Sequence, residues 1–417
     1  MKKILLILLC LPMIGFGQGW VKNFYDSSAD YPDVHNVIST QDSGYAVINY
    51  HGIIKTNSYG DTIWTNQNYS GTYNGIQTYD GGFLLMGFYG FYKLNNLGIF
   101  QWQNTNIFLE PYFIEQTADS GFVYTGTGAG NLRVADERLR VVRTKPNLDT
   151  LWVSQPYPWD TLSILDIEGL GKDVHQTNDG NYILAGFRYI LNSSLPHYDN
   201  AFLSKISNNG DTLWTKVYSF GDESRIYSVL ENSNDNFVFA GISTDWFPNY
   251  NYCRDILIAE TDPQGNLIWV KTYPSNCKAS VRSIEKGHNG GYILCGTREI
   301  NNGEDKIWVL RTDNFGDTIW TKSFGNPYGY GRSIKKTLDG GYIITGTAWQ
   351  NSFNESIILI KIDENGNMTN TFNIPINPNR KLQKTVDLLG RESKPEKNIP
   401  FIEIYDDGTV EKKITID

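Results

Sequence analysis

The chain of 417 residues is short of several features that mark familiar function classes. Basic residues number 36 against 45 acidic ones, so the formal net charge is −9 and no basic field is available to neutralise nucleic-acid phosphates. The five histidines are scattered, no cysteine–histidine cluster has zinc spacing, and no nucleophile elbow or phosphate-binding loop is present. After residue 17 no apolar run is long enough to cross a membrane. We therefore expect no nucleic-acid partner, no metal, no cofactor, no transmembrane segment and no catalytic residue of a familiar type.

The N-terminus has the three parts of a secretory signal peptide. Lys2 and Lys3 form a short positive region, and Ile4 to Ile14 is an apolar run too short to span a bilayer. Gly15-Phe16-Gly17 then supplies small residues at the usual cleavage spacing. The sequence predicts that residues 1–17 are a signal peptide and that the protein is exported.

An internal repeat indicates the fold. Aromatic residues make up 14% of the chain and glycine contributes 40 residues, which favours short strands and tight turns over helices. A turn followed by an aromatic residue recurs at Tyr45, Phe83, Phe122, Tyr182, Phe237, Tyr292 and Tyr342. A tryptophan recurs at Trp64, Trp102, Trp152, Trp214, Trp269 and Trp320. The repeats are about 38 to about 60 residues long, close to the span of a four-stranded propeller blade. The sequence therefore predicts an all-β fold, a β-propeller of about seven four-stranded blades over residues 18–372.

The start of the mature chain predicts how the ring closes. Residues 19–24, Gly-Trp-Val-Lys-Asn-Phe, look like the tryptophan strand of a blade but precede the first complete unit. The final unit ends in Met368 to Phe372, a degraded version of the same strand. We expect residues 19–25 to complete the last blade, because this pairing would remove an exposed sheet edge.

The remaining cysteines are Cys253, Cys277 and Cys295. Cys253 and Cys277 lie at equal distances on either side of the turn glycine Gly265, so an antiparallel hairpin places them opposite each other. We predict a disulfide between them, consistent with an oxidising compartment outside the cytoplasm. Cys295 falls in a strand of the next blade, where we expect a buried free thiol.

We name the four strands of a blade A to D, from the inside to the outside. Strands alternate in direction, so the variable B–C and D–A loops share one face, and function concentrates on such loops. Aromatic residues in these loops and arginines near the start of strand A predict a ligand-binding site around the central opening. The candidate residues are Arg225, Arg282, Arg332, Trp246, Tyr250, Tyr330 and Trp349. The predicted ligands are glycans or proteins, for a secreted or surface-bound adhesion module.

Two other functions stay open at this point. The turn from Thr312 to Trp320 resembles the Asp-box of sialidase-type propellers, which implies a carbohydrate-active enzyme. A glycosidase would need two carboxylates facing each other across a cleft. A non-catalytic structural protein of the cell surface is the other alternative.

From Asn373 the repeat stops, and residues 373–417 form a separate C-terminal β segment. Its motifs are Val-Asp-Leu-Leu-Gly-Arg-Glu, from Val386, and Ile-Tyr-Asp-Asp-Gly-Thr-Val, from Ile404. In this order at the extreme C-terminus they resemble the type A sorting domain of type IX secretion cargo. The matching residues are Leu389, Gly390, Arg391, Tyr405, Asp407, Gly408 and Lys412. The resemblance implies contact with a secretion machinery and delivery to the outer surface, or the surroundings, of a Gram-negative bacterium.

Overall fold

The chain divides into two compact units, Met1–Met368 and Thr369–Asp417. The computed structural model describes residues 19–24, 33–105, 110–127, 139–156, 167–190, 198–247, 251–275, 278–300, 303–325, 328–351, 354–368, 381–387, 391–395, 401–405 and 410–413. The predicted signal peptide, residues 1–17, lies outside these ranges. Within them, no helix is both long and apolar enough to pass through a lipid bilayer.

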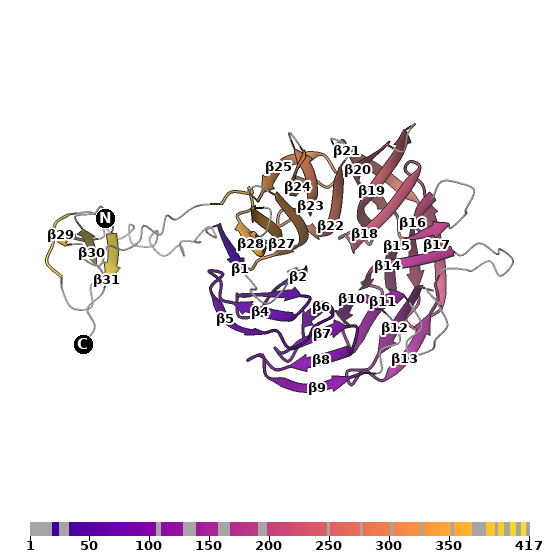
Figure 1. Cartoon of the computed structure of the whole chain (residues 1–417), viewed down its shortest axis with the longest axis horizontal. Helices are drawn as coiled ribbons and strands as arrows, with labels where there is room; N and C mark the ends of the chain where they lie inside the picture. Colours follow the sequence, from indigo (N-terminus) through magenta and orange to yellow (C-terminus); the bar gives the residue numbers. More distant parts are fainter. Residues whose placement is uncertain are drawn as a thin grey trace, which may run out of the picture. The chain divides into compact units, whose positions relative to one another are not determined.

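The first unit is a β-propeller, as predicted: its described residues form seven four-stranded antiparallel sheets arranged in a ring (Figure 1). The A strands line the centre and are β2 (Val34–Ser39), β6 (Thr72–Gln77), β10 (Glu110–Gln116), β14 (Ile167–Gln176), β18 (Glu223–Glu231), β22 (Ala279–Lys286) and β26 (Tyr328–Lys336). The B strands each begin at a repeat aromatic and are β3 (Tyr45–Asn49), β7 (Phe83–Gly87), β11 (Phe122–Thr127), β15 (Tyr182–Ile190), β19 (Phe237–Phe247), β23 (Tyr292–Ile300) and β27 (Tyr342–Asn351).

The outer half of each blade follows the same order. The C strands are β4 (Gly52–Thr56), β8 (Gly90–Leu94), β12 (Leu139–Thr144), β16 (Tyr198–Ile206), β20 (Asn251–Thr261), β24 (Glu304–Thr312) and β28 (Asn354–Ile362). The D strands are β5 (Thr62–Asn66), β9 (Phe100–Asn104), β13 (Thr150–Ser154), β17 (Thr212–Tyr218), β21 (Leu267–Tyr273), β25 (Thr318–Phe324) and β1 (Trp20–Phe24). Strands B and C are short in the first two blades and longer in the last four. The B–C hairpins of the last four blades therefore extend further than those of the first two.

The ring closes through the first strand. β1 pairs antiparallel with β28, from Trp20 opposite Lys361 to Phe24 opposite Ile357. It thereby supplies the D strand of the blade that contains β26, β27 and β28 (Figure 1). Both ends of the propeller are thus held in one sheet, and β28 has a partner on each side.

A buried cation explains why strand C and the A–B turn repeat together. Lys55 of β4 is 3% exposed, and its Nζ lies 2.8 Å from the carboxylate of Asp42 in the turn after β2. The same pair recurs as Lys93–Asp80, Lys205–Asp179, Lys361–Asp339 and, with arginine, Arg143–Asp119. Since a buried charge requires a partner, each pair fixes its A–B turn against strand C.

The repeated tryptophan has a different role, between blades. Trp214 of β17 lies against Gly265 in the next blade's C–D turn, where an added Cβ would come within 2.9 Å of the ring. Trp20, Trp64, Trp152, Trp269 and Trp320 meet a turn glycine in the same way. Gly265 also has a φ of 79°, which other residues adopt at a cost. Tryptophan and glycine therefore repeat in step because each packs on the other.

The cysteines follow this framework. Cys295 lies in β23 and is a buried free thiol, as predicted, and burial raises its pKa. Cys253 lies in β20 and is not a free thiol. Cys277 falls outside the described residues, so the disulfide between Cys253 and Cys277 stays a prediction.

The second unit contains a three-stranded antiparallel sheet in the order β29 (Leu382–Val386), β30 (Phe401–Tyr405) and β31 (Val410–Lys413). Arg391 folds back onto Asp387 with 2.8 Å from its Nε to the carboxylate, and Tyr405 is largely buried. Lys412 lies in β31. The other residues of the predicted sorting signal, Leu389, Gly390, Asp407 and Gly408, lie outside the described residues.

Candidate binding site

Every A strand carries a β-bulge at the same position. In β26, Gly331 pairs with Gly346 and Ser333 with Thr345, which leaves Arg332 as the extra residue. A bulge re-aims a side chain and is common next to functional sites. The seven bulge residues, here called the bulge ring, are His35, Tyr73, Tyr112, Lys172, Tyr227, Arg282 and Arg332.

The bulge ring lines a central cavity of about 260 Å³ to which all seven A strands contribute. Neighbouring members contact one another around the ring. The rings of His35 and Tyr73 are 5.6 Å apart, Lys172 Nζ lies 3.7 Å from the centre of the Tyr112 ring, and the Arg282 guanidinium lies 4.7 Å from that of Tyr227. The bulges therefore bring aromatic faces and cations from seven blades into one layer.

Two of these cations have no counter-charge. Among the described residues, no carboxylate lies within ion-pair distance of Lys172 or Arg282. Lys172 is half-buried, and burial together with the charges of Arg282 and Arg225 lowers its pKa to about 8. The Arg282 side chain is exposed to the channel. Partial loss of hydration inside the channel, together with the charges of nearby arginines, lowers its pKa. The site thus holds positive charge that the folded chain does not neutralise.

The opposite side of the ring is mixed in charge. Arg332 Nη2 lies 3.4 Å from Asp33 Oδ1, while Arg332 Nε is buried without a hydrogen-bond partner. His35 Nε2 is also buried and without a partner. Burial lowers the pKa of His35 to about 4, Asp33 opposes this shift and Arg332 adds to it. His35 is therefore a neutral imidazole with one free ring nitrogen at the cavity wall.

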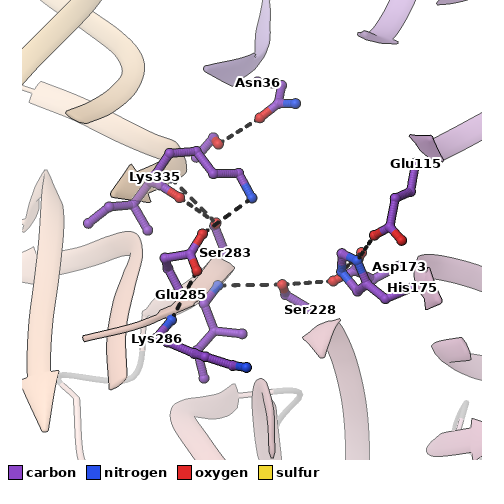
Figure 2. A network of polar contacts seen from close by, with 12 residues as sticks. Asn36, Glu115, Asp173, His175, Ser228, Ser283, Glu285, Lys286 and Lys335 are labelled. Atoms are coloured by element: carbon purple, nitrogen blue, oxygen red, sulfur yellow. Dashed lines mark hydrogen bonds and ion pairs between the residues drawn. The ribbon is translucent and has the colours of Figure 1, made fainter. Parts of the chain in front are cut away.

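A second layer lies one to three residues after the bulge residues in the A strands. We call it the polar belt: Asn36, Asn74, Glu115, Asp173, His175, Ser228, Ser283 and Ser333. Its hydrogen bonds connect each A strand to the next around the propeller, partly drawn in Figure 2. The Ser333 hydroxyl donates to Asn36 Oδ1 at 2.8 Å, and Asn36 Nδ2 donates to Asn74 Oδ1 at 3.1 Å. The belt is therefore a closed circuit through all seven blades.

The strongest part of the belt joins β10, β14 and β18. His175 lies between two carboxylates, with Glu115 at Nδ1 and Asp173 at Nε2, the latter at 3.0 Å (Figure 2). Asp173 also accepts bonds from the Ser228 hydroxyl at 2.8 Å and from the Val229 amide at 2.9 Å. Burial alone disfavours the charged imidazole, but Asp173 and Glu115 outweigh it and raise the pKa of His175 to about 10. This group is a structural ion triad rather than a free acid or base.

Of the three predicted arginines, Arg282 and Arg332 belong to the bulge ring. Arg225 lies two residues before its blade's bulge residue, Tyr227, and is absent from the cavity wall. Its Nε donates to Asp199, and its guanidinium lies 5.2 Å from the Phe187 ring centre. The charge of Arg225 still acts on the cavity residues, because it contributes, after burial, to lowering the pKa of Lys172 and of Arg282.

The predicted aromatics fall into two groups. Tyr330 and Trp349 pack edge to face with ring centres 5.0 Å apart. The Tyr330 hydroxyl donates to Asp305 at 2.9 Å, and burial and this carboxylate raise its pKa to about 12. Trp246 lies in β19, but its side chain is outside the described structure, and so is Tyr250.

Sequence reasoning missed five of the seven bulge residues, His35, Tyr73, Tyr112, Lys172 and Tyr227. The usable signal was positional: each of these residues lies a fixed step before the A–B turn of its repeat. Their side chains differ in type, so no motif marks the column. Among the described residues, no group of three or more His, Cys, Asp or Glu side chains is arranged to hold a metal ion.

Comparisons with known proteins return structures and no sequence relatives. No family model and no curated protein matches the chain. Similar solved structures include a protein of unknown function from Bacteroides caccae, at 12% identity over 70% of this chain and 94% of that one, with a TM-score of 0.42. The Dos1 propeller matches at 9% identity over 84% and 95%, with a TM-score of 0.48.

A further similar structure is the extracellular domain of a proposed hybrid two-component system from B. thetaiotaomicron. It matches at 11% identity over 92% of this chain, with a TM-score of 0.48, and this chain spans 46% of that one. At such identities the likeness concerns the fold alone.

Proposed function

We propose that this protein is an exported binding propeller that holds part of a glycan at the mouth of its central channel. The observation that carries the proposal is the bulge ring. Seven blades turn aromatic and polar side chains toward one small cavity, on the side where the A strands begin. Aromatic faces stack on the apolar faces of sugars, and a few placed polar groups fix their orientation.

The size of the cavity favours a compact ligand or the end of a chain. Its volume of about 260 Å³ is just below the range of roughly 300–1,000 Å³ typical of sites for small molecules. Tyr330 and Trp349 extend the aromatic surface beyond the bulge ring, on the predicted B–C and D–A face. A terminal sugar in the channel with further units on this face fits the arrangement.

A glycan array with the chain lacking residues 1–17 tests this function. We expect retention of a defined set of glycans and a loss of at least about tenfold in affinity for Tyr227→Ala, which removes one stacking face. Tyr59→Ala is the matched control, because Tyr59 lies in an outer C–D turn and is 69% exposed. If the array is silent while a protein is captured through Tyr227, the ligand is a protein. If neither binds, the propeller has a structural role.

Export is proposed from the two ends of the chain. The signal peptide would take the protein across the inner membrane, and the tail resembling a type IX sorting domain would take it across the outer membrane. The Arg391–Asp387 contact and the sheet of β29, β30 and β31 support a folded element in the tail. Deletion of residues 381–417 in the native host should leave the propeller in the periplasm, as fractionation would detect. Secretion without the tail would overturn this part of the proposal.

One observation favours an enzymatic alternative. Glu355, half-buried at the start of β28, has a raised pKa because of burial and the nearby charge of Asp33. Asp33 lies 3.4 Å from Arg332, and the charges of both residues act on Glu355, so the two carboxyls lie near the same side of the bulge ring. A carboxyl with a raised pKa close to a second carboxyl is an arrangement used in glycoside hydrolysis. Hydrolysis of a bound glycan that is abolished by both Glu355→Gln and Asp33→Asn would establish it.

A further inference from the structure

The charge at the centre of this propeller runs against the charge of the whole chain. The protein carries a formal net charge of −9, yet Lys172, Arg282 and Arg332 meet within one layer of the channel. Lys172 and Arg282 have no carboxylate partner among the described residues, and their charges disfavour each other. Like charges held together in a concave space create a focused positive potential that favours an anion.

The neighbouring groups indicate how an anion would be held. The guanidinium of Arg282 lies over the ring of Tyr227 and Lys172 Nζ over that of Tyr112, so aromatic faces fix both cations without neutralising them. Lys55 and Lys205 pair with Asp42 and Asp179 elsewhere in the propeller, but in the part of the chain that the structure describes no carboxylate pairs with Lys172 or Arg282. Arginine and lysine presented in this way recognise carboxylates, sulfates and phosphates through charge-assisted hydrogen bonds.

An independent observation comes from hydrogen bonding. Buried polar atoms are normally paired, but two atoms of the bulge ring are not: His35 Nε2 and Arg332 Nε. Both residues line the same cavity as Lys172 and Arg282. Arg332 Nε is a donor, and His35 is a neutral imidazole that can donate or accept. The cavity therefore has unpaired hydrogen-bonding capacity beside unpaired charge.

We infer that the bulge ring binds the oxyanion of an acidic sugar, with Arg282 and Lys172 contacting the charged group and tyrosine faces packing on the sugar ring. This inference rests on the proposed glycan-binding function and specifies its ligand class. The shared chemistry is a carboxylate or sulfate carried on a pyranose. The volume of the cavity admits one such unit. Negative charge elsewhere on the protein would repel the rest of an acidic chain and leave the channel as its point of attachment.

The test compares charged ligands with their neutral counterparts on the chain lacking residues 1–17. Calorimetry measures binding of oligogalacturonate and of its methyl ester, which has the same sugars without charge. A sulfated galactan and its desulfated form make the second pair. We expect binding of at least one charged member, with its neutral form at least about tenfold weaker. The pair that binds distinguishes a carboxylate from a sulfate.

Variants then assign the binding to the channel. Arg282→Gln and Lys172→Met should each weaken binding of the charged ligand by at least about tenfold while leaving the affinity for its neutral form unchanged. Lys271→Gln is the matched control: it removes an exposed cation on the outer strand β21, paired with Asp317. Thermal unfolding is measured for every variant to identify any that fails to fold. If one of the two channel variants fails to fold, binding by the other one tests the inference.

The outcomes separate this inference from the proposed function. Equal binding of charged and neutral glycans, unaffected by either channel variant, would overturn the inference and leave glycan binding intact. Equal losses in Lys271→Gln and Arg282→Gln would also overturn it, because binding would then follow overall charge. No binding of any glycan, charged or neutral, would overturn both.

Discussion

The bulge ring and the polar belt occupy neighbouring residues of the same seven strands, yet their polar groups are treated in opposite ways. In the belt, Asp173 receives a hydroxyl, an amide and an imidazole, and hydrogen bonds run on to every blade. In the ring, Lys172, the residue directly before Asp173, has no acidic partner among the residues that the structure describes. The belt therefore pairs its charged groups with one another, whereas two cations of the adjacent ring lack a carboxylate partner among the described residues.

This difference separates stability from function. A satisfied buried network fixes structure, and breaking it leaves buried groups unpaired. An unsatisfied layer costs stability, and natural proteins keep such layers mainly where a ligand completes them. If the comparison holds, belt variants should lower the free energy of unfolding of the propeller, and ring variants should weaken ligand binding with little effect on stability.

The largest expected effect is on the belt, at Asp173. Asp173→Ala leaves the Ser228 hydroxyl, the Val229 amide and the charged His175 without their buried acceptor. Removing one partner of a buried ion pair costs about 3–5 kcal/mol. Urea unfolding followed by tryptophan fluorescence should therefore show a free energy of unfolding lower by that amount.

Asp61→Ala provides the comparison on the surface. Asp61 pairs with Lys22 at 2.8 Å, but its side chain is 59% exposed, so the loss should stay below about 1 kcal/mol. Equal losses in the two variants would mean that the belt is no more than a set of surface contacts.

A pH dependence specific to the belt comes next in size. The His175 pKa is raised to about 10, from about 6.5 in an unfolded chain, since Asp173 and Glu115 together outweigh burial. A raised folded pKa means that the stability contributed by the imidazolium is fully present below about pH 6.5 and is lost as the pH rises toward 10. The stability difference between the wild type and His175→Gln should therefore shrink from pH 6 to pH 10. Parallel curves over this range would show that His175 is not held as a cation.

The layout of the propeller was predictable because its determinants are local in the sequence. Five of the seven repeats carry an Asp in the A–B turn that pairs with a lysine or arginine of strand C within the blade. Each repeat also has a tryptophan in strand D, and most of these tryptophans pack on a turn glycine across one blade boundary. The strand at Trp20 was recognisable as the missing D strand because it has the same pattern. β1 lies where that pattern places it.

The ligand site was harder to predict because it depends on a register shift. A bulge adds one residue to strand A, so simple alternation does not show which side chains face the channel. The sequence predicted Arg282 and Arg332 because both arginines lie near the start of an A strand. The same rule also selected Arg225, which lies outside the cavity wall, and it missed Tyr227 and Lys172. Only the pairing of strand A with strand B shows which residue is the extra one in the bulge.

A weaker link tests whether the belt acts as a circuit. The Ser333 hydroxyl is 2.8 Å from Asn36 Oδ1 and joins the last blade to the first, beside the closure by β1. Ser333 is 4% exposed, so Ser333→Ala should cost about 1 kcal/mol, the net value of one hydrogen bond. Differential scanning calorimetry would detect the change in melting temperature. A stability equal to that of the wild type would show that the belt does not need this link.

The smallest expected effect on stability is in the bulge ring, and it is the most informative about function. Arg282→Gln removes a guanidinium that has no acidic partner within the described ranges and that is repelled by Arg332 and Arg225. The folded state loses the contact with Tyr227 and is relieved of repulsion, so the free energy of unfolding should change by less than about 0.5 kcal/mol. A loss as large as that of Asp173→Ala would mean that Arg282 holds the structure together. The unpaired charge in the ring would then have a structural explanation, and the anion site would lose its main support.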